Sequence, residues 1–330
     1  MKQKYFALLS ILALLASCNN KLDVNASWQD ITVVYGLLNQ NDSIHYLRIT
    51  KAYLGPGDAL QFAKIPDSSN YPGKLNVRLE EWDITTGIDS TLKNTYYFDT
   101  TSIPKDTGTF YYFPYQKVYY INKKLNENYT YKLFITQPKS GKTVTGRTEL
   151  IAPLTINTPK TGNKAAILPQ KEIPLEFLSS KYGRRYQLTI RFYYVEYPAK
   201  DTLSIEWQVF NDITSNDLQG GQVISPAYQG DGLYSALKSH LSVDPNITRN
   251  AIAVDYILSA GSDDLNTYMN VNAPSTTIVQ ERPDYTDIVN GIGLFTSIYD
   301  NTVVHRLHLA IGQVMQDSLK TNSNTYNLGF

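Results

Sequence analysis

The chain has 330 residues, 30 basic and 30 acidic side chains, and a charged fraction of only 18%. Without a basic surplus it is poorly suited to bind nucleic acid or an anionic membrane surface, so we expect no nucleic-acid partner. The length is ample for two hydrophobic cores. With 26 tyrosines against 11 phenylalanines and 3 tryptophans, the composition favours strands. Helical periodicity is confined to short segments, so we predict a mainly β protein.

The first residues carry a targeting pattern. Lys2 and Lys4 precede a short apolar run, and small residues then lead to Cys18, the only cysteine of the chain. The run is too short to cross the roughly 30 Å hydrocarbon core, and it has the layout of a secretory signal. The letters LASC resemble the lipobox of bacterial lipoproteins. That resemblance implies removal of residues 1–17 and acylation of Cys18.

The alternative is a cleaved secretory signal with a chance cysteine at the junction. The lack of a second cysteine favours the anchor, because such an exported chain cannot form an internal disulfide. Each buried methylene contributes about 0.8 kcal/mol, and the lipoprotein modification supplies two or three acyl chains, so anchoring would be durable. We expect residues 18–29 to form a polar tether, and the remainder, which has no second long apolar segment, to be soluble.

Alternating apolar and polar side chains predict strands in the first half of the chain. A hairpin is expected at 33–50 with its turn at 39–42, and one helical turn at 60–64. Further strands are expected at 75–79, 96–98, 110–120, 129–135 and 143–150. This pattern predicts an immunoglobulin- or fibronectin-like β-sandwich over residues 30–150.

Residues 151–170 are rich in Pro, Thr, Lys and Asn, and we interpret them as an interdomain linker. Residues 171–330 then form a second β-rich domain with a few short helices. Helices are expected at 231–240 and from 263 toward 270, the second one capped by Ser262. Strands are expected at 173–177, 188–194, 203–209, 252–259, 292–298 and 306–311.

Motifs for catalysis or cofactor binding are weak. SGKT at 140–143 lacks the first glycine of a phosphate loop and lies between two strands, so we predict a hairpin turn. His305 and His308 would diverge on a strand, and neither HExxH nor GxSxG occurs. Asp263 and Asp264 are better explained as a helix start than as an acid pair. We therefore expect no enzyme activity, no cofactor and no metal site.

The clearest hint of binding is aromatic. Phe110 to Tyr115 read FYYFPY, and alternation places Tyr111, Phe113 and Tyr115 on one face of a strand. If exposed, these rings could stack on sugars or anchor a protein partner. Packing within the sandwich or between domains is the alternative.

A second recurring pattern is Asp followed by Ser or Thr and then a small apolar residue or Thr. It resembles the O-glycosylation motif of exported Bacteroidota proteins. Asp-Ser and Asp-Thr are also common in turns, which is the alternative explanation. The candidate acceptors are Ser43, Ser90, Thr100, Thr202 and Ser318.

Three stretches resemble an uncharacterised family of Bacteroidota outer-membrane lipoproteins, a domain of unknown function. They are the lipobox, NENYTYKLFITQPKSGKTVTGRTELIAP at 126–153 and YTDIVNGIGLFTS at 285–297, where Val289-Asn290 replaces the usual acidic-glycine step. The resemblance implies a lipoprotein of the outer membrane, often encoded near TonB-dependent receptors, and no known activity. Gly291 and Gly293 also indicate a strand that backbone or a partner approaches closely.

Together these features predict a lipid-anchored outer-membrane protein with a non-catalytic binding or scaffolding role, accessory to a β-barrel transporter or an adhesion system. A glycan-binding surface lipoprotein that uses exposed tyrosines is the alternative. A hydrolase whose acids are assembled only by folding is favoured least. Asp23 is the first acid after Cys18, and it stands five residues from the cysteine. The sequence therefore leaves two equal alternatives for the anchored protein: it faces the periplasm, or it faces the outside of the cell.

Overall fold

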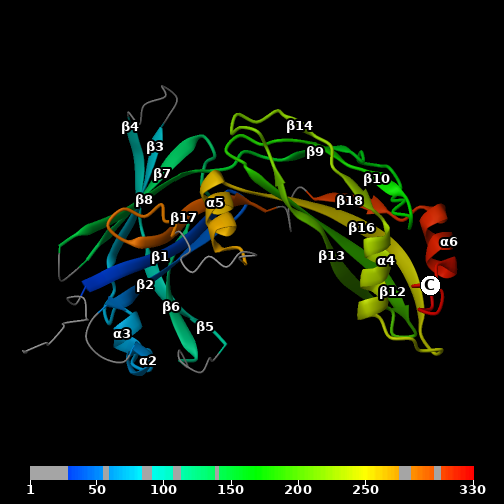
Figure 1. The fold of residues 1–330 in the computed structure, drawn as a ribbon, viewed down its shortest axis with the longest axis horizontal. Coiled ribbons are helices and arrows are strands. Elements are labelled where there is room, and N and C mark those ends of the chain that lie inside the picture. The colour runs from blue at the N-terminus through cyan, green and yellow to red at the C-terminus, as the bar shows by residue number, and fades with distance from the viewer. Residues whose placement is uncertain are drawn as a thin grey trace, which may run out of the picture.

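The computed structural model describes residues 29–54, 59–83, 91–106, 113–137, 141–274, 284–300 and 306–330. The structure is mainly β with a few short helices, which confirms the predicted class. Two lobes form an arch in Figure 1, with the N-terminal lobe on the left and the C-terminal lobe on the right. One large sheet runs through both of them.

The large sheet joins strands from both ends of the chain. Its strands are β1 (Gln29–Asn39), β2 (Ile44–Leu54), β5 (Asp99–Pro104), β6 (Tyr115–Asn122), β12 (Arg185–Tyr197), β13 (Asp201–Thr214), β16 (Thr248–Gly261), β17 (Ile292–Tyr299) and β18 (Leu307–Ala310). Their order is β13-β12-β16-β17-β1-β2-β6-β5, and β18 pairs with β16 beside this path. Among the described residues, β16 and β17 pair through only Ala260–Tyr299 and Gly261–Ile298, so the large sheet is narrow where it passes from one lobe to the other.

The N-terminal lobe is a sandwich of this sheet and a second one in the order β4-β3-β7-β8. The second sheet contains β3 (Asn76–Asp83), β4 (Thr91–Tyr97), β7 (Tyr129–Thr136) and β8 (Thr143–Glu149), and the single-turn helices α2 (Ala59–Phe62) and α3 (Pro66–Ser69) precede it. Alternate residues of facing strands, such as Val34, Leu47, Leu79 and Leu133, are fully buried between the sheets. The predicted hairpin over 33–50 is confirmed by the pairing of β1 with β2.

The C-terminal lobe packs small sheets and helices against β12, β13 and β16. These elements are β9 (Thr155–Thr158), β10 (Glu172–Pro174), β11 (Glu176–Leu178), β14 (Val223–Ile224), β15 (Ala227–Gln229), α4 (Asp231–His240) and α6 (Gln313–Thr321). Their apolar side chains meet Leu188, Ile190 and Phe192 of β12 in a second core. The predicted helix at 231–240 is confirmed, and the strands predicted at 188–194 and 203–209 lie within β12 and β13, which pair with each other.

The linker prediction for residues 151–170 is wrong. β9 lies within this segment and pairs with β11. Ile151, Ala165 and Ile167 are buried in the second core, so the segment is part of the C-terminal lobe. The apolar residues in this stretch are spaced irregularly between prolines and lysines, which hides their burial from a periodicity argument.

The boundary predicted for the second domain, 171–330, also needs correction at β17. This strand pairs in parallel with β1, from Val33–Ile292 to Asn39–Ile298. Ile288 and Phe295 are buried in the N-terminal core, and Thr145 of β8 forms a bridge with Val289. Residues 288–295 therefore complete the N-terminal lobe, although they follow most of the C-terminal lobe in the sequence.

Both cores lie on the same face of the large sheet. Phe295 belongs to the N-terminal core and Tyr299 to the C-terminal core, and residues four apart on a strand share a face. The opposite face, here called the open face, carries α5 (Asp263–Asn272) next to β17. The open face spans both lobes, so residues of either lobe can contribute to a site on it.

Candidate functional site

The predicted aromatic platform is only partly described by the structure. Tyr111 lies outside the described residues. Phe113 is half-buried, with the Lys105 ammonium 5.8 Å from its ring centroid. Tyr115 begins β6 and is 64% exposed. Because Tyr115 alternates in phase with the core residue Tyr119, it lies beyond the end of the core and not on the open face.

A different aromatic group occupies the open face of the N-terminal lobe. Leu37 of β1 is 43% exposed and Tyr46 of β2 is 48% exposed, and Ile44 is exposed next to them along β2. Tyr46 pairs across the sheet with Tyr120 of β6, with ring centroids 6.4 Å apart and planes inclined by 39°. These four residues, Leu37, Ile44, Tyr46 and Tyr120, are called the open-face patch.

Helix α5 borders this patch through Tyr35. The Tyr35 and Tyr268 hydroxyl oxygens lie 3.3 Å apart, and their rings meet edge-on at 6.2 Å. The hydrogen bond to Tyr268 and burial raise the pKa of Tyr35, so this phenol stays neutral at physiological pH. Arg48 places its guanidinium 4.9 Å from the Tyr35 ring centroid, which puts one exposed cation beside the apolar patch.

The open face of the C-terminal lobe is polar and centres on Asp255. This carboxylate is fully buried, and Tyr193 donates its hydroxyl to Oδ2 at 2.8 Å. Arg306 Nε lies 2.7 Å from the same oxygen, and His308 Nδ1 lies 2.6 Å from Oδ1. Tyr193, Arg306 and His308 thus surround the buried Asp255 carboxylate. The contact with Nδ1 orients the His308 ring so that its Nε2 is directed away from Asp255.

The sequence arguments missed Asp255. A usable signal was present, because an acid interrupts the apolar run IAVDYIL of β16. Buried carboxylates are paired, so such an acid predicts cationic partners on neighbouring strands. The strand predicted at 306–311 is confirmed by β18, whereas His305 lies outside the described residues. Among the residues that the structure describes, no three His, Cys, Asp or Glu side chains form a metal-binding group.

Two motifs have the structural roles that the sequence predicts. β7 and β8 form a hairpin around the SGKT stretch, and Gln137 N donates to Lys142 O at 3.0 Å. Ser262 caps α5 by accepting from Leu265 N at 3.1 Å. Asp264 in the first turn accepts the Tyr285 hydroxyl at 2.5 Å.

The candidate O-glycosylation residues differ in accessibility. Ser43, in the turn between β1 and β2, and Thr202, at the start of β13, are exposed. Thr100 on β5 and Ser318 on α6 are half-buried, which makes them poorer acceptors in the folded chain. Ser90 lies outside the described residues.

The candidate anchor Cys18 and the signal at residues 1–17 also lie outside the described residues, as does the tether except for Gln29. Within the described part of the chain, no helix combines the length and the apolar character needed to span a bilayer.

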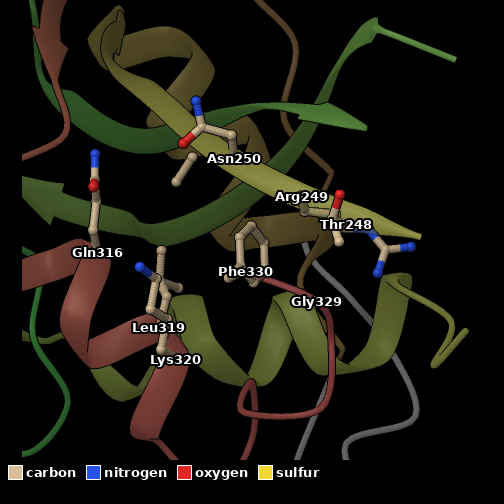
Figure 2. Close-up of a pocket in the computed structure, with 9 residues that line it drawn as sticks. Thr248, Arg249, Asn250, Gln316, Leu319, Lys320, Gly329 and Phe330 are labelled. Carbon is tan, nitrogen blue, oxygen red and sulfur yellow. The ribbon is translucent and has the colours of Figure 1, made fainter. Parts of the chain in front are cut away.

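A cavity of about 270 Å³ opens between β16 and α6 (Figure 2). It is lined by Thr248, Arg249, Asn250, Ala251, Gln316, Leu319, Lys320, Gly329 and Phe330. Arg249 is buried and ion-paired with Glu196, with Nε 3.0 Å from Oε2. The ring of Phe330 meets that of Phe192 edge-on at 5.9 Å. Arg249 N of β16 also donates to Gly329 O at 2.6 Å. These contacts hold the last residues against β12 and β16, so we interpret this cavity as a structural junction.

Comparison with known proteins assigns no family to the chain. It matches none of the protein-family models and none of the curated proteins with which it was compared. Three features bear on its function: the lipobox-like motif, the resemblance to envelope lipoproteins and the two regions of the open face.

Proposed function

We propose that this chain is a lipid-anchored envelope lipoprotein with a non-catalytic binding role, accessory to a protein of the outer membrane. The observation that carries the proposal is the open-face patch. Leu37 and Tyr46 lie side by side on β1 and β2, since the register pairs Gly36 with Leu47, and both side chains are more than two-fifths exposed. Contiguous exposed apolar side chains of this kind mark interaction surfaces.

A protein partner fits the patch better than a glycan. The patch combines two aliphatic side chains with two tyrosines, and protein interfaces bury such aliphatic and aromatic anchors together. Sugar stacking needs an aromatic face free on one side, for which exposed Tyr46 and Tyr115 are the candidates. A glycan-binding lipoprotein is therefore the second candidate function.

Hydrolysis is the candidate favoured least. The strongest acid–histidine pair on the open face is Asp255 with His308, and its carboxylate is engaged by Tyr193 and Arg306 as well. A carboxylate that balances this many donors suits a structural role in the sheet.

The anchor is tested by replacing Cys18 with serine in the cell of origin. We expect the wild-type protein to sediment with membranes and to incorporate labelled palmitate. The Cys18→Ser variant should lose the label and leave the membrane fraction. A variant that keeps both properties would rule out the lipid anchor.

The binding surface is tested by a double variant, Leu37→Thr with Tyr46→Thr, which keeps strand-forming residues on the open face. A photo-crosslinking residue at Ile44 should attach one outer-membrane protein, and the double variant should reduce that yield at least about tenfold. The matched control is Tyr97→Thr, an exposed tyrosine of β4 on the second sheet. Equal yields from the double variant and the control would contradict the proposed surface.

A further inference from the structure

A second cavity lies where the two lobes meet, and it shares no lining residue with the open-face patch. Its volume is about 520 Å³, within the roughly 300–1,000 Å³ range of small-molecule sites. Its walls come from the turn after β1, the connection between β6 and β7, residue Pro153 and the end of β17. Such junctions between packed units are a preferred location for ligand sites.

Amide side chains dominate the lining of this junction cavity. Four of its nine residues are Gln40, Asn41, Asn126 and Asn128. Local hydrogen bonds hold three of the amides, since Asn41 Nδ2 donates to Asp300 O at 2.9 Å and Asn126 Oδ1 accepts from Asn128 Nδ2 at 3.0 Å. Each amide offers both a donor and an acceptor, which complements the hydroxyl groups of a sugar.

Gln40 is the most informative of these residues. Its side chain is only 5% exposed, and its Oε1 has no hydrogen-bond partner among the described residues. Buried polar atoms nearly always have a partner, so an orphan acceptor in a cavity lining calls for an explanation. That oxygen has almost no accessible surface, so a hydroxyl group of a bound molecule supplies the missing donor only when the Gln40 side chain turns toward the cavity.

The remaining lining residues give the cavity no preference for an anion or a cation. Lys124 and Glu127 are both exposed on the connection between β6 and β7, and their charges oppose each other. The other three residues, Leu125, Pro153 and Tyr299, contribute apolar surface. A lining of amides, apolar surface and balanced charge matches an uncharged, hydroxyl-rich molecule better than an anion or a cation.

We propose that the junction cavity is a binding site for an uncharged mono- or disaccharide. Its contacts are the amides of Gln40, Asn126 and Asn128. The site is separate from the open-face patch and does not depend on the protein-binding role of that surface.

The experiment is a titration of the chain that begins at residue 19, monitored by amide chemical shifts. The probes are glucose, galactose, N-acetylglucosamine, maltose and cellobiose, with glycine and inorganic phosphate as charged comparisons. We expect at least one sugar to shift the amides of residues 124–128 in a saturable way. Asn128→Ala and Gln40→Met should each weaken that binding about tenfold, because each removes one sugar contact.

Asn211→Ala is the matched control, since Asn211 is an exposed asparagine on β13, and it should leave the affinity unchanged. The variant with threonine at positions 37 and 46 should also bind sugar normally, which separates this site from the open-face patch. The proposal fails if no sugar in the set binds at about 10 mM. It also fails if Asn128→Ala binds as tightly as the wild type, or if only the charged probes bind.

Discussion

Asp287 accepts the backbone N–H of Phe295 with both carboxylate oxygens, at 3.0 Å each, and so closes the loop that leads into β17. Burial raises the pKa of Asp287 to about 7, and the neighbouring Asp264 carboxylate also acts to raise it. A carboxyl group with a raised pKa in the folded state favours folding when it is protonated. Its stabilising effect is therefore complete below the unfolded value near pH 4 and is lost as the pH rises through about 7.

At the residue scale we predict that Asp287→Asn flattens this pH dependence. The amide can still accept from Phe295 N and carries no charge to bury, so the variant should melt at a higher temperature than the wild type at pH 8. Thermal unfolding at pH 5 and pH 8 measures both effects. Asp212→Asn, on the exposed side of β13, is the control. An equal loss of stability between pH 5 and pH 8 in the wild type and Asp287→Asn would contradict the assignment.

At the scale of single elements, β17 depends on glycines because its backbone lies against that of β1. Gly293 has φ +121°, and a Cβ built on it would meet Val34 O at 1.9 Å. A Cβ on Gly291 would meet Thr32 O at 2.8 Å. The close backbone approach expected from these two glycines is therefore confirmed, and the partner that approaches is the first strand of the chain.

We predict that Gly293→Ala lowers the free energy of unfolding by more than about 3 kcal/mol, because backbone strain adds to the clash with Val34. Denaturant titration of the purified variant measures the change. The control is Gly73→Ala, since a Cβ added to Gly73 would meet no atom within 4 Å and its backbone is not left-handed. Its effect should stay within about 1 kcal/mol. Similar losses in both variants would show that β17 tolerates a side chain at position 293.

At the scale of the whole molecule, the arrangement of β17 makes the N-terminal lobe depend on the far end of the chain. A Cβ built on Gly146 would lie 2.9 Å from Phe295 Cβ, which shows how closely β8 packs on this ring. Ile288 completes the same core. Without residues 284–300, the lobe would contain a hole in its core and an unpaired edge along β1.

We predict that a fragment of residues 29–150 does not fold by itself. Its amide NMR spectrum should show the narrow dispersion of an unfolded or molten chain. Fusing residues 284–300 to its C-terminus through a flexible linker should restore dispersed signals and a cooperative melt. A well-dispersed spectrum from the shorter fragment would mean that the first lobe is an independent domain.

Local sequence patterns predict most individual strands of this protein. Alternation identifies β3, β7 and β12, and polar turns mark the hairpins that β7 forms with β8 and β12 with β13. Helix α6 was missed, although Met315 and Leu319, four residues apart, are both fully buried on one of its faces. Strands, turns and short helices depend on neighbours within a few residues of the chain. Periodicity and turn chemistry can therefore identify them from the sequence.

The sequence by itself determined the β class, the turns, the cap of α5 and the signal-like pattern that ends at Cys18. Only the tertiary structure decided that β17 pairs with β1, that 151–170 is part of a core, and that Tyr46 and Tyr120 meet on an open face. It also brought Gln40 and Asn128 to one cavity. The physical reason is that these contacts join residues far apart in the chain. Alternation specifies which face of a strand is apolar but not which distant strand will pair with it.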